Sequence, residues 1–234
     1  MLRRTTIVAL VSLAGCGDVV IGTFVASGSD GSSSGEVVGP LPGGCVEEAF
    51  DGSFDENLWL TWADDDATTF VQDGALTLVP PSSPEIGTGF VWHQEVAFEF
   101  ANASARVEVI TPPDPSSLTE LFLQVTQVEP PTGAVLSFGL FQNGVRVRGY
   151  RDDGSEAFAQ PIAIPYPRWI GIRTADARVH FEVSDDGDTW TELSSFDVPG
   201  TFVGTTPLVM AWNNAGGPVT PQPVVVDALQ VCAQ

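Results

Sequence analysis

Two glutamates could place carboxylates close together on one strand. In residues 94–100, strand alternation puts Glu95 and Glu99 on one side of the chain and apolar residues on the other. Two carboxylates held close together can act as nucleophile and general acid in the hydrolysis of a glycosidic bond. Ala97 lies between them, so this side of the strand offers no third acid. We therefore interpret Glu95 and Glu99 as a solvated strand face.

The sequence offers little else for catalysis. Its two histidines, His93 and His180, lie in predicted strands, and the sequence contains no G-x-S-x-G, no H-E-x-x-H and no glycine-rich phosphate loop. We expect a domain without catalytic activity. An enzyme with an unfamiliar site is the alternative.

Basic and aromatic side chains provide a candidate binding surface. The pair Asn143-Gly144 predicts a two-residue hairpin turn. The strand after this turn sends Arg146, Arg148 and Tyr150 to the side that faces away from the core. Guanidinium groups and phenol rings can bind sugar hydroxyls or carboxylates, so we predict a ligand surface here. A solvated face that balances nearby acids is the alternative.

Three tryptophans extend this hypothesis. Trp62, Trp92 and Trp212 lie outside the clear core alternation or near the ends of predicted strands. A flat indole ring can stack on a sugar ring, and it can equally fill a core. We predict that these three residues contribute to the ligand surface.

Composition excludes one broad class of partner. All nine basic residues are Arg, and 30 Asp and Glu residues give a formal net charge of −21 at pH 7. Nucleic-acid binding requires clustered positive charge, so we expect no nucleic-acid partner. Strong acidity is typical of a surface outside the cytoplasm and can recruit divalent cations.

The N-terminus has the features of a lipoprotein signal peptide. Arg3 and Arg4 precede a short apolar segment, residues 5–13, which ends in Leu-Ala-Gly-Cys16. This segment is too short to span a bilayer as a mature helix. We predict that residues 1–15 are removed and that Cys16 carries acyl chains, which would hold the protein at a membrane surface. An ordinary signal peptide with a chance cysteine is the alternative.

A flexible tether follows the predicted lipid anchor. Residues 27–44 are rich in Ser, Gly and Pro and show no apolar pattern, so we assign residues 16–44 to the anchor and tether. Gly17 rather than Asp follows Cys16, which by enterobacterial sorting rules predicts the outer membrane of a bacterial cell envelope. The folded domain then covers residues 45–234.

The two remaining cysteines flank this domain. Cys45 opens it and Cys232 lies two residues from the end of the chain. In an oxidising envelope such a pair predicts one disulfide, with two free thiols as the alternative.

Short β-rich runs separated by turn residues predict an all-β domain. The expected strands include residues 46–50, 90–100, 105–111, 118–128, 134–142 and 145–150, with further strands to the end of the chain. Their regular spacing and the absence of an internal repeat favour an antiparallel two-sheet sandwich or jelly roll over a propeller.

Several motifs resemble those of concanavalin A-like lectin/glucanase jelly rolls. They are Phe50-Asp51-Gly52 with Asp55 and Trp59, the run DGALTL at 73–78, the run RWIGIR at 168–173 with the SDDGDTW hairpin after it, and VVDALQV at 225–231. The resemblance covers residues 46–232 and is diffuse. It implies two antiparallel sheets, one of them concave, with the termini side by side.

The resemblance also implies two possible sites. Hydrolases of this fold that resemble glycoside hydrolase family 16 carry E-x-D-x-x-E on one strand, and residues 94–100 come nearest to that pattern without completing it. Related jelly rolls often bind a structural Ca²⁺ near a last-strand Asp, and matching by position gives Asp51 and Asp227 as ligands. Solvated acidic loops are the alternative.

The phrase Ser184-Asp-Asp-Gly-Asp-Thr-Trp190 resembles the Asp-box of sialidases but is one residue shorter and occurs once. A two-residue loop around Asp186-Gly187 would bury Trp190. A three-residue loop would place Trp190 opposite Glu182 on the outer face and Leu193 on the apolar side. We favour the three-residue loop.

These observations together predict an envelope lipoprotein with a non-catalytic jelly-roll domain that binds carbohydrate or another surface ligand. A structural or adhesive lipoprotein without a glycan site is the first alternative, and a glycoside hydrolase is the second.

Overall fold

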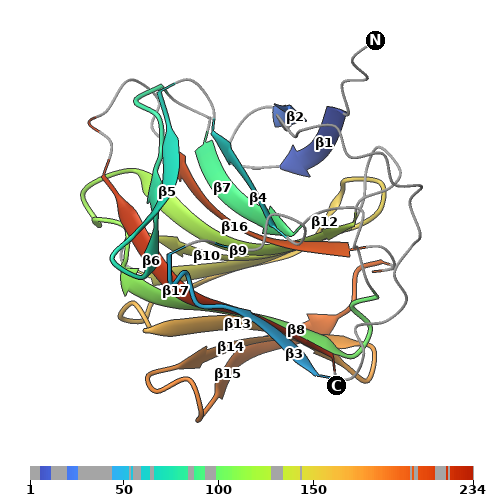
Figure 1. The fold of residues 1–234 in the computed structure, drawn as a ribbon. Coiled ribbons are helices and arrows are strands. Elements are labelled where there is room, and N and C mark those ends of the chain that lie inside the picture. Colours follow the sequence, from blue (N-terminus) through green and yellow to red (C-terminus); the bar gives the residue numbers. More distant parts are fainter. Residues whose placement is uncertain are drawn as a thin grey trace.

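The computed structural model describes most of the predicted domain and two short strands before it. The described residues are 6–11, 20–25, 44–52, 54, 59–63, 66–83, 87–92, 99–127, 134–142, 144–200, 202, 205–213, 220 and 222–233. They contain strands and no helix, and so no helix that could cross a membrane. The chain is an antiparallel two-sheet sandwich (Figure 1). This confirms the predicted fold class.

One sheet has seven strands. Their spatial order is β12 (Glu156–Ile162), β11 (Gly144–Tyr150), β10 (Val135–Phe141), β9 (Thr119–Gln127), β16 (Thr205–Asn213), β7 (Gly87–Trp92) and β4 (Trp59–Ala63). The sequence did not predict β12 or β4, which are the two edge strands.

The other sheet has eight strands. Seven follow the order β15 (Thr191–Asp197), β14 (Arg178–Ser184), β13 (Trp169–Ala175), β8 (Ala103–Thr111), β17 (Val224–Ala233), β6 (Ala75–Val79) and β5 (Thr68–Gln72). The short strand β3 (Cys45–Glu48) also pairs with β17.

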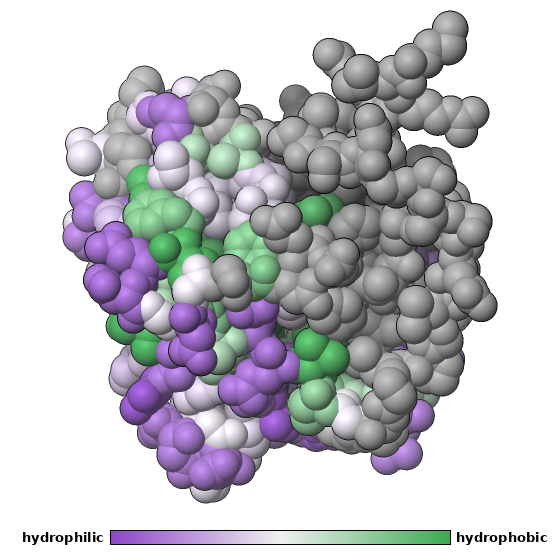
Figure 2. Space-filling view, viewed as in Figure 1, coloured by the Kyte–Doolittle hydropathy of each residue, from purple (hydrophilic) through white to green (hydrophobic). Residues whose placement is uncertain are grey.

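Alternating apolar side chains from both sheets form the core between them. On β9, for example, Leu121, Leu123 and Val125 are fully buried and belong to the main core cluster. Burial of apolar surface of this kind is the dominant favourable contribution to folding. Figure 2 shows hydrophilic side chains over much of the coloured surface, with smaller hydrophobic areas between them.

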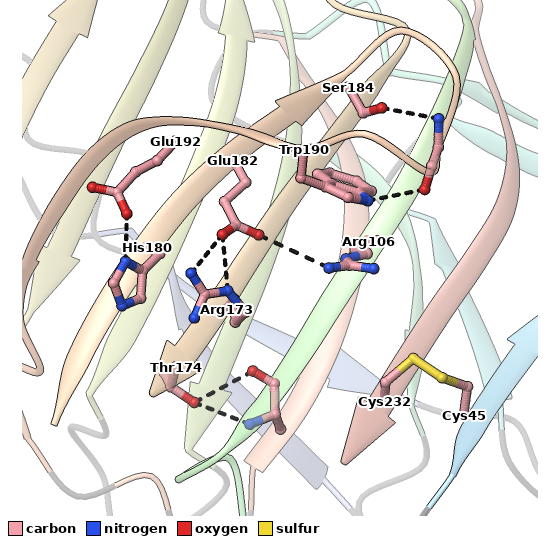
Figure 3. Close-up of polar contacts among 12 residues, drawn as sticks. Cys45, Arg106, Arg173, Thr174, His180, Glu182, Ser184, Trp190, Glu192 and Cys232 are labelled. Carbon is pink, nitrogen blue, oxygen red and sulfur yellow. Dashed lines mark hydrogen bonds and ion pairs between the residues drawn. A yellow bond between two sulfur atoms is a disulfide. The ribbon is translucent and has the colours of Figure 1, made fainter. Parts of the chain in front are cut away.

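The predicted disulfide is confirmed. Cys45 and Cys232 are bonded partners in the register of β3 and β17, 187 residues apart in sequence (Figure 3). The backbone N–H of Ala233 also donates to the carbonyl of Gly44 at 3.1 Å. The first and last strands of the domain, β3 and β17, are therefore held together.

The hairpin between β10 and β11 turns one residue earlier than predicted. Phe141 pairs with Gly144, and Gln142 takes a positive φ of 50°. Asn143 lies outside the described residues. The register moves by two residues, so the predicted division between core and outer side chains on β11 is kept.

Two strands precede the sandwich. β1 (Thr6–Val11) and β2 (Val20–Val25) pair with each other in a two-stranded sheet. In Figure 1 they lie on the side of the seven-stranded sheet that faces away from the eight-stranded sheet. Cys16 and residues 26–43 lie outside the described residues, so the lipid anchor and tether remain predictions.

Candidate ligand-binding face

The outer face of the seven-stranded sheet, which points away from the main core, carries most of the predicted ligand residues. Its side chains alternate with the core residues on each strand. On β9 they are Glu120, Phe122 and Gln124, between the core residues described above. Phe122 belongs to a second apolar cluster, separate from the main core.

Three aromatic rings on this face lie over glycines. A Cβ built at Gly89 would be 2.8 Å from Nε1 of Trp62, and one at Gly87 would be 2.9 Å from Cε3 of Trp212. A Cβ at Gly139 would be 2.8 Å from Cε1 of Phe122. The glycines therefore let rings from neighbouring strands lie close to the sheet backbone. We call Trp62, Phe122 and Trp212 the aromatic platform.

Aliphatic side chains from β16 complete this apolar cluster. Leu208 and Met210 pack with Phe122 and Trp212, and Trp62 packs against them partly buried. Trp212 is 4% exposed and Met210 is fully buried. The cluster is therefore buried in the full chain, although it lies on the outer side of the sheet.

A buried ion pair lies beside the platform. Nη1 of Arg146 on β11 is 3.5 Å from Oε1 of Glu120 on β9, and the Glu120 side chain is fully buried. The Arg146 guanidinium also lies over the ring of Phe141, 4.7 Å from its centroid. Burial lowers the pKa of Arg146, while the charge of Glu120 raises it and that of Arg148 lowers it. Arg146 and Arg148 therefore lie close enough to interact.

Several buried polar atoms on this face lack a partner. Nη1 of Arg148, the hydroxyl of Tyr150 and Nε1 of Trp212 are buried without a hydrogen-bond partner among the described residues. Gln124 by contrast donates to Ser137 at 3.2 Å. Buried polar groups are nearly always hydrogen-bonded, and unpaired ones are expected to meet a ligand or water.

The structure brings five of the six predicted ligand residues to one face. These five are Trp62, Trp212, Arg146, Arg148 and Tyr150. Position 92 pairs with Trp59, which belongs to the main core, rather than with Trp62. The side chain of Trp92 lies outside what the structure describes.

Sequence reasoning missed the centre of the face. Leu208 and Met210 lie in a run that is apolar on both sides and so shows no alternation, whereas Glu120 and Phe122 alternate with core residues on β9. The signal that could have found them is the glycine pattern at positions 87, 89 and 139 within strand-like runs, since glycine in a strand marks close approach of another group.

The described part of this face shows no pair of carboxylates suited to glycoside hydrolysis. Its buried carboxylate, Glu120, is paired with Arg146. Glu95 lies outside the described residues, and Glu99 is exposed after β7. The imidazole of His180 is on the other sheet, where its Nδ1 lies 2.6 Å from Oε2 of Glu192 (Figure 3).

Trp190, whose position depended on the register of its hairpin, lies on the outer face of the eight-stranded sheet. The ring lies over Gly171, where a Cβ would be 2.9 Å from Cζ3, and the Arg106 guanidinium is 4.2 Å from the ring centroid. Glu182 is bound by Arg173 at 2.7 Å (Figure 3). Trp190 is therefore on the outer face, as favoured.

Neither predicted register of that hairpin is correct. Glu182 pairs with Glu192 and Phe181 with Ser194, so a bulge lies between them and shifts the register. The bulge lets Leu193 pack partly buried against the main core while Trp190 stays outside.

Asp51 and Asp227, the predicted calcium ligands, lie near each other. Burial raises the pKa of Asp227, and the charges of Glu108 and Asp51 raise it further, against a lowering by the N–H of Ala228. Phe50 and Ala228, the neighbours of the two acids, have positive φ of 52° and 43°. Within the described residues no three His, Cys, Asp or Glu side chains form a metal-binding group. Two carboxylates fit part of a calcium site, with backbone carbonyls needed for the rest.

The fold is similar to that of several solved glucanases. A Bacillus licheniformis β-glucanase superposes with a TM-score of 0.64 at 11% identity, over 83% of this chain and 100% of that one. A laminarinase from Rhodothermus marinus gives a TM-score of 0.61 at 13% identity, over 80% and 96%. The catalytic domain of an endo-1,3-β-glucanase from Thermotoga petrophila RKU-1 gives 0.57 at 12% identity, over 80% and 95%.

No family model matches the sequence, and neither does any curated protein. At identities this low, the likeness to the solved structures establishes the fold alone. The chain has the concanavalin A-like jelly-roll fold, as the sequence motifs implied.

Proposed function

We propose that this domain binds carbohydrate through the outer face of the seven-stranded sheet and does not hydrolyse it. The observation that carries the proposal is the aromatic platform, three rings that lie over Gly87, Gly89 and Gly139. Flat rings bind sugars by packing against the C–H groups of a pyranose, and polar side chains nearby bind the hydroxyls. Arg148 and Tyr150 supply such polar groups.

The likeness to glucan-degrading enzymes supports the class of ligand. The solved proteins named above are called glucanases and laminarinases, so their names describe enzymes that act on polysaccharides with the same fold. A shared fold does not imply a shared activity, so the residues of the site must support the proposed function.

Access to the face is the next requirement of the proposal. The platform is largely buried in the full chain, and β1 and β2 lie on this side of the sheet (Figure 1). β1 falls wholly within the predicted signal peptide, residues 1–15. Signal-peptide removal would separate β1 from β2, and our proposal requires that the platform becomes accessible in the mature protein.

A glycoside hydrolase is the second candidate, favoured by the names of the structural neighbours. A retaining enzyme needs two carboxylates about 5 Å apart. Glu120 is held by Arg146 as an ion pair, which suits it to structure rather than to proton transfer. Release of reducing sugar from laminarin or mixed-linkage glucan that is abolished in Glu120→Gln would favour the hydrolase.

A glycan array tests the binding proposal. The array can be probed with the chain that starts at Gly44. Its strands β3 to β17 pair only with one another in the two large sheets, and the disulfide joins the first of these strands to the last. We expect binding that Trp62→Ala removes. Phe70→Ala is the matched control, since Phe70 is an exposed aromatic residue on β5 of the other sheet. An array without any bound glycan would instead favour a structural or adhesive protein.

We also propose that Cys16 anchors the protein to the bacterial envelope, in the outer membrane. The motif Leu-Ala-Gly-Cys16 and the tether of residues 16–44 support this. Membrane fractionation of the full chain and of Cys16→Ser tests it, and a variant that stays in the membrane fraction would contradict the anchor.

A further inference from the structure

We infer that this face selects a glycan that carries an anionic group, a carboxylate or a sulfate, which binds at Arg148. The inference rests on the proposed carbohydrate binding and specifies its ligand. The first support is the local charge. Two guanidinium groups, Arg146 and Arg148, share one part of the face, and the carboxylate of Glu120 pairs with Arg146.

The environment of Arg148 is the second support. The residue is 5% exposed, and its Nη1 is buried without a hydrogen-bond partner among the described residues. A buried cation without a partner destabilises a fold, so such groups are retained where they meet an opposite charge. The hydroxyl of Tyr150, next on the same side of β11, is also buried and unpaired. The two groups together offer donors to one oxyanion.

Donor chemistry favours an anion over a neutral hydroxyl. A guanidinium group has five N–H donors and no acceptor, and its planar fork matches a carboxylate or a sulfate. Hydrogen bonds between two charged groups are roughly twice as strong as neutral ones. An anionic ligand would thus satisfy Arg148 in charge as well as in hydrogen bonding.

The position of Arg148 relative to the platform suits a polymer of sugars. Arg148 pairs with Ser137 on β10, which pairs with Gln124 on β9, the strand of Phe122. Strands lie about 4.8 Å apart, so Arg148 is roughly 10 Å from β9 and roughly 14 Å from β16, the strand of Trp212. A glycan that crosses the strands can stack on the platform with one sugar and present an anionic group to Arg148 with another.

The net charge of the protein makes the binding of an anionic glycan informative. With a net charge of −21 the molecule repels polyanions, most strongly at low salt, so adsorption of an anionic glycan without a specific site is disfavoured. Binding of an anionic oligosaccharide therefore reports a local site.

Calorimetric titration of the chain from Gly44 with paired ligands tests the inference. Tetragalacturonate against its methyl ester isolates the carboxylate, and sulfated laminarin against laminarin isolates the sulfate. We expect the charged member of at least one pair to bind about tenfold more tightly or better. Equal or tighter binding of both neutral members would overturn the inference and leave carbohydrate binding intact. Failure of all four ligands together with an empty glycan array would overturn both.

Substitution of Arg148 tests the residue itself. Arg148→Gln should remove the preference for the charged ligand and keep the binding of the neutral one, whereas Arg178→Gln should change neither. The control Arg178→Gln removes the same charge from the other sheet, where Arg178 pairs with the exposed Asp197 at 3.1 Å. The melting temperature of ligand-free Arg148→Gln should be unchanged or raised, because an unpaired buried charge is removed. A clear drop in that temperature would identify Arg148 as a structural residue and overturn the inference.

Discussion

Phe122 lies over Gly139, its direct partner in the register of β9 and β10, so closely that a Cβ at position 139 would be 2.8 Å from Cε1 and 2.9 Å from Cδ1 of the ring. Glycine normally weakens a strand, and its replacement by alanine would ordinarily help. We predict that Gly139→Ala instead lowers the unfolding free energy, by about 1–3 kcal/mol, because Phe122 must move.

A double-mutant cycle in chemical denaturation checks this relationship. Gly139→Ala combined with Phe122→Ala should cost less than the sum of the single changes, because the clash disappears with the ring. Strictly additive effects would show that the ring does not depend on the glycine.

The disulfide should make a large contribution to stability. Closure of a loop between Cys45 and Cys232 restricts the unfolded chain, and the loop-entropy model gives up to about 5 kcal/mol for so long a loop. We predict that Cys45→Ser with Cys232→Ser lowers the melting temperature strongly, and that a reducing agent affects the wild type alone. A wild type insensitive to reduction would contradict this.

Acid should destabilise the hairpin between β14 and β15. Oδ1 of Asp186 accepts the N–H groups of Thr189 at 2.7 Å and Asp188 at 2.9 Å, and these bonds lower the pKa of Asp186 to about 2. A carboxylate with a lowered pKa stabilises the fold above its ordinary value of 3.8, and this contribution is lost as the pH falls toward about 2.

Asp186→Asn should reduce this acid dependence. Thermal unfolding between neutral pH and pH about 2 should show a smaller loss for the variant than for the wild type. Asp185→Asn is the matched control, since Asp185 is its exposed neighbour. Identical pH profiles of Asp186→Asn and wild type would exclude the role of these bonds.

Asp227 should behave in the opposite way. Its pKa is raised, chiefly by burial, so its ionised form destabilises the fold at neutral pH and the penalty is relieved as the pH falls. We predict that Asp227→Asn raises the melting temperature in the presence of a chelator. If Asp51 and Asp227 bind Ca²⁺, the ion should raise the melting temperature of the wild type and leave Asp227→Asn unchanged. A wild type that does not respond to Ca²⁺ would end the calcium hypothesis.

Removal of residues 1–43 should leave the sandwich intact. β1 and β2 hydrogen-bond only to each other, so deletion takes no strand from either large sheet. The chain from Gly44 should unfold cooperatively, with a melting temperature close to that of the full chain. A broad or absent transition would show that the N-terminal segment is part of the fold.

Two strands of the large sheets, β4 and β12, were not predicted from the sequence, and the reason is the same for both. β12 contains Pro161 and alternates poorly, and β4 is a run of five residues. Both are edges of the seven-stranded sheet, where one neighbour suffices and proline is tolerated. Central strands such as β9 and β16 are buried on both faces, so they were found as strands while their outer residues stayed hidden among core residues.

The candidate face was predictable only in part for the same reason. Arg146 and Arg148 were correctly assigned to the outer side of β11, because a charged residue in an alternating strand identifies the outer side. Phe122 was not assigned to this face, although Glu120 and Gln124, two residues before and after it, are polar and identify its side of β9 as the outer one. The register that aligns Trp62, Gly89, Met210 and Phe122 in one row depends on long-range pairing, which local sequence does not contain.

The bond between Cys45 and Cys232 also determines how the domain would respond to mechanical load. If the residues before Gly44 form a tether, as predicted, a pull on it would enter at residue 44 and would peel the short strand β3 if hydrogen bonds alone held it. The covalent link passes that load to β17, an interior strand that pairs with both β8 and β6. A load directed along β17 would act in shear on many hydrogen bonds at once, so the domain would resist mechanical unfolding from its N-terminal end.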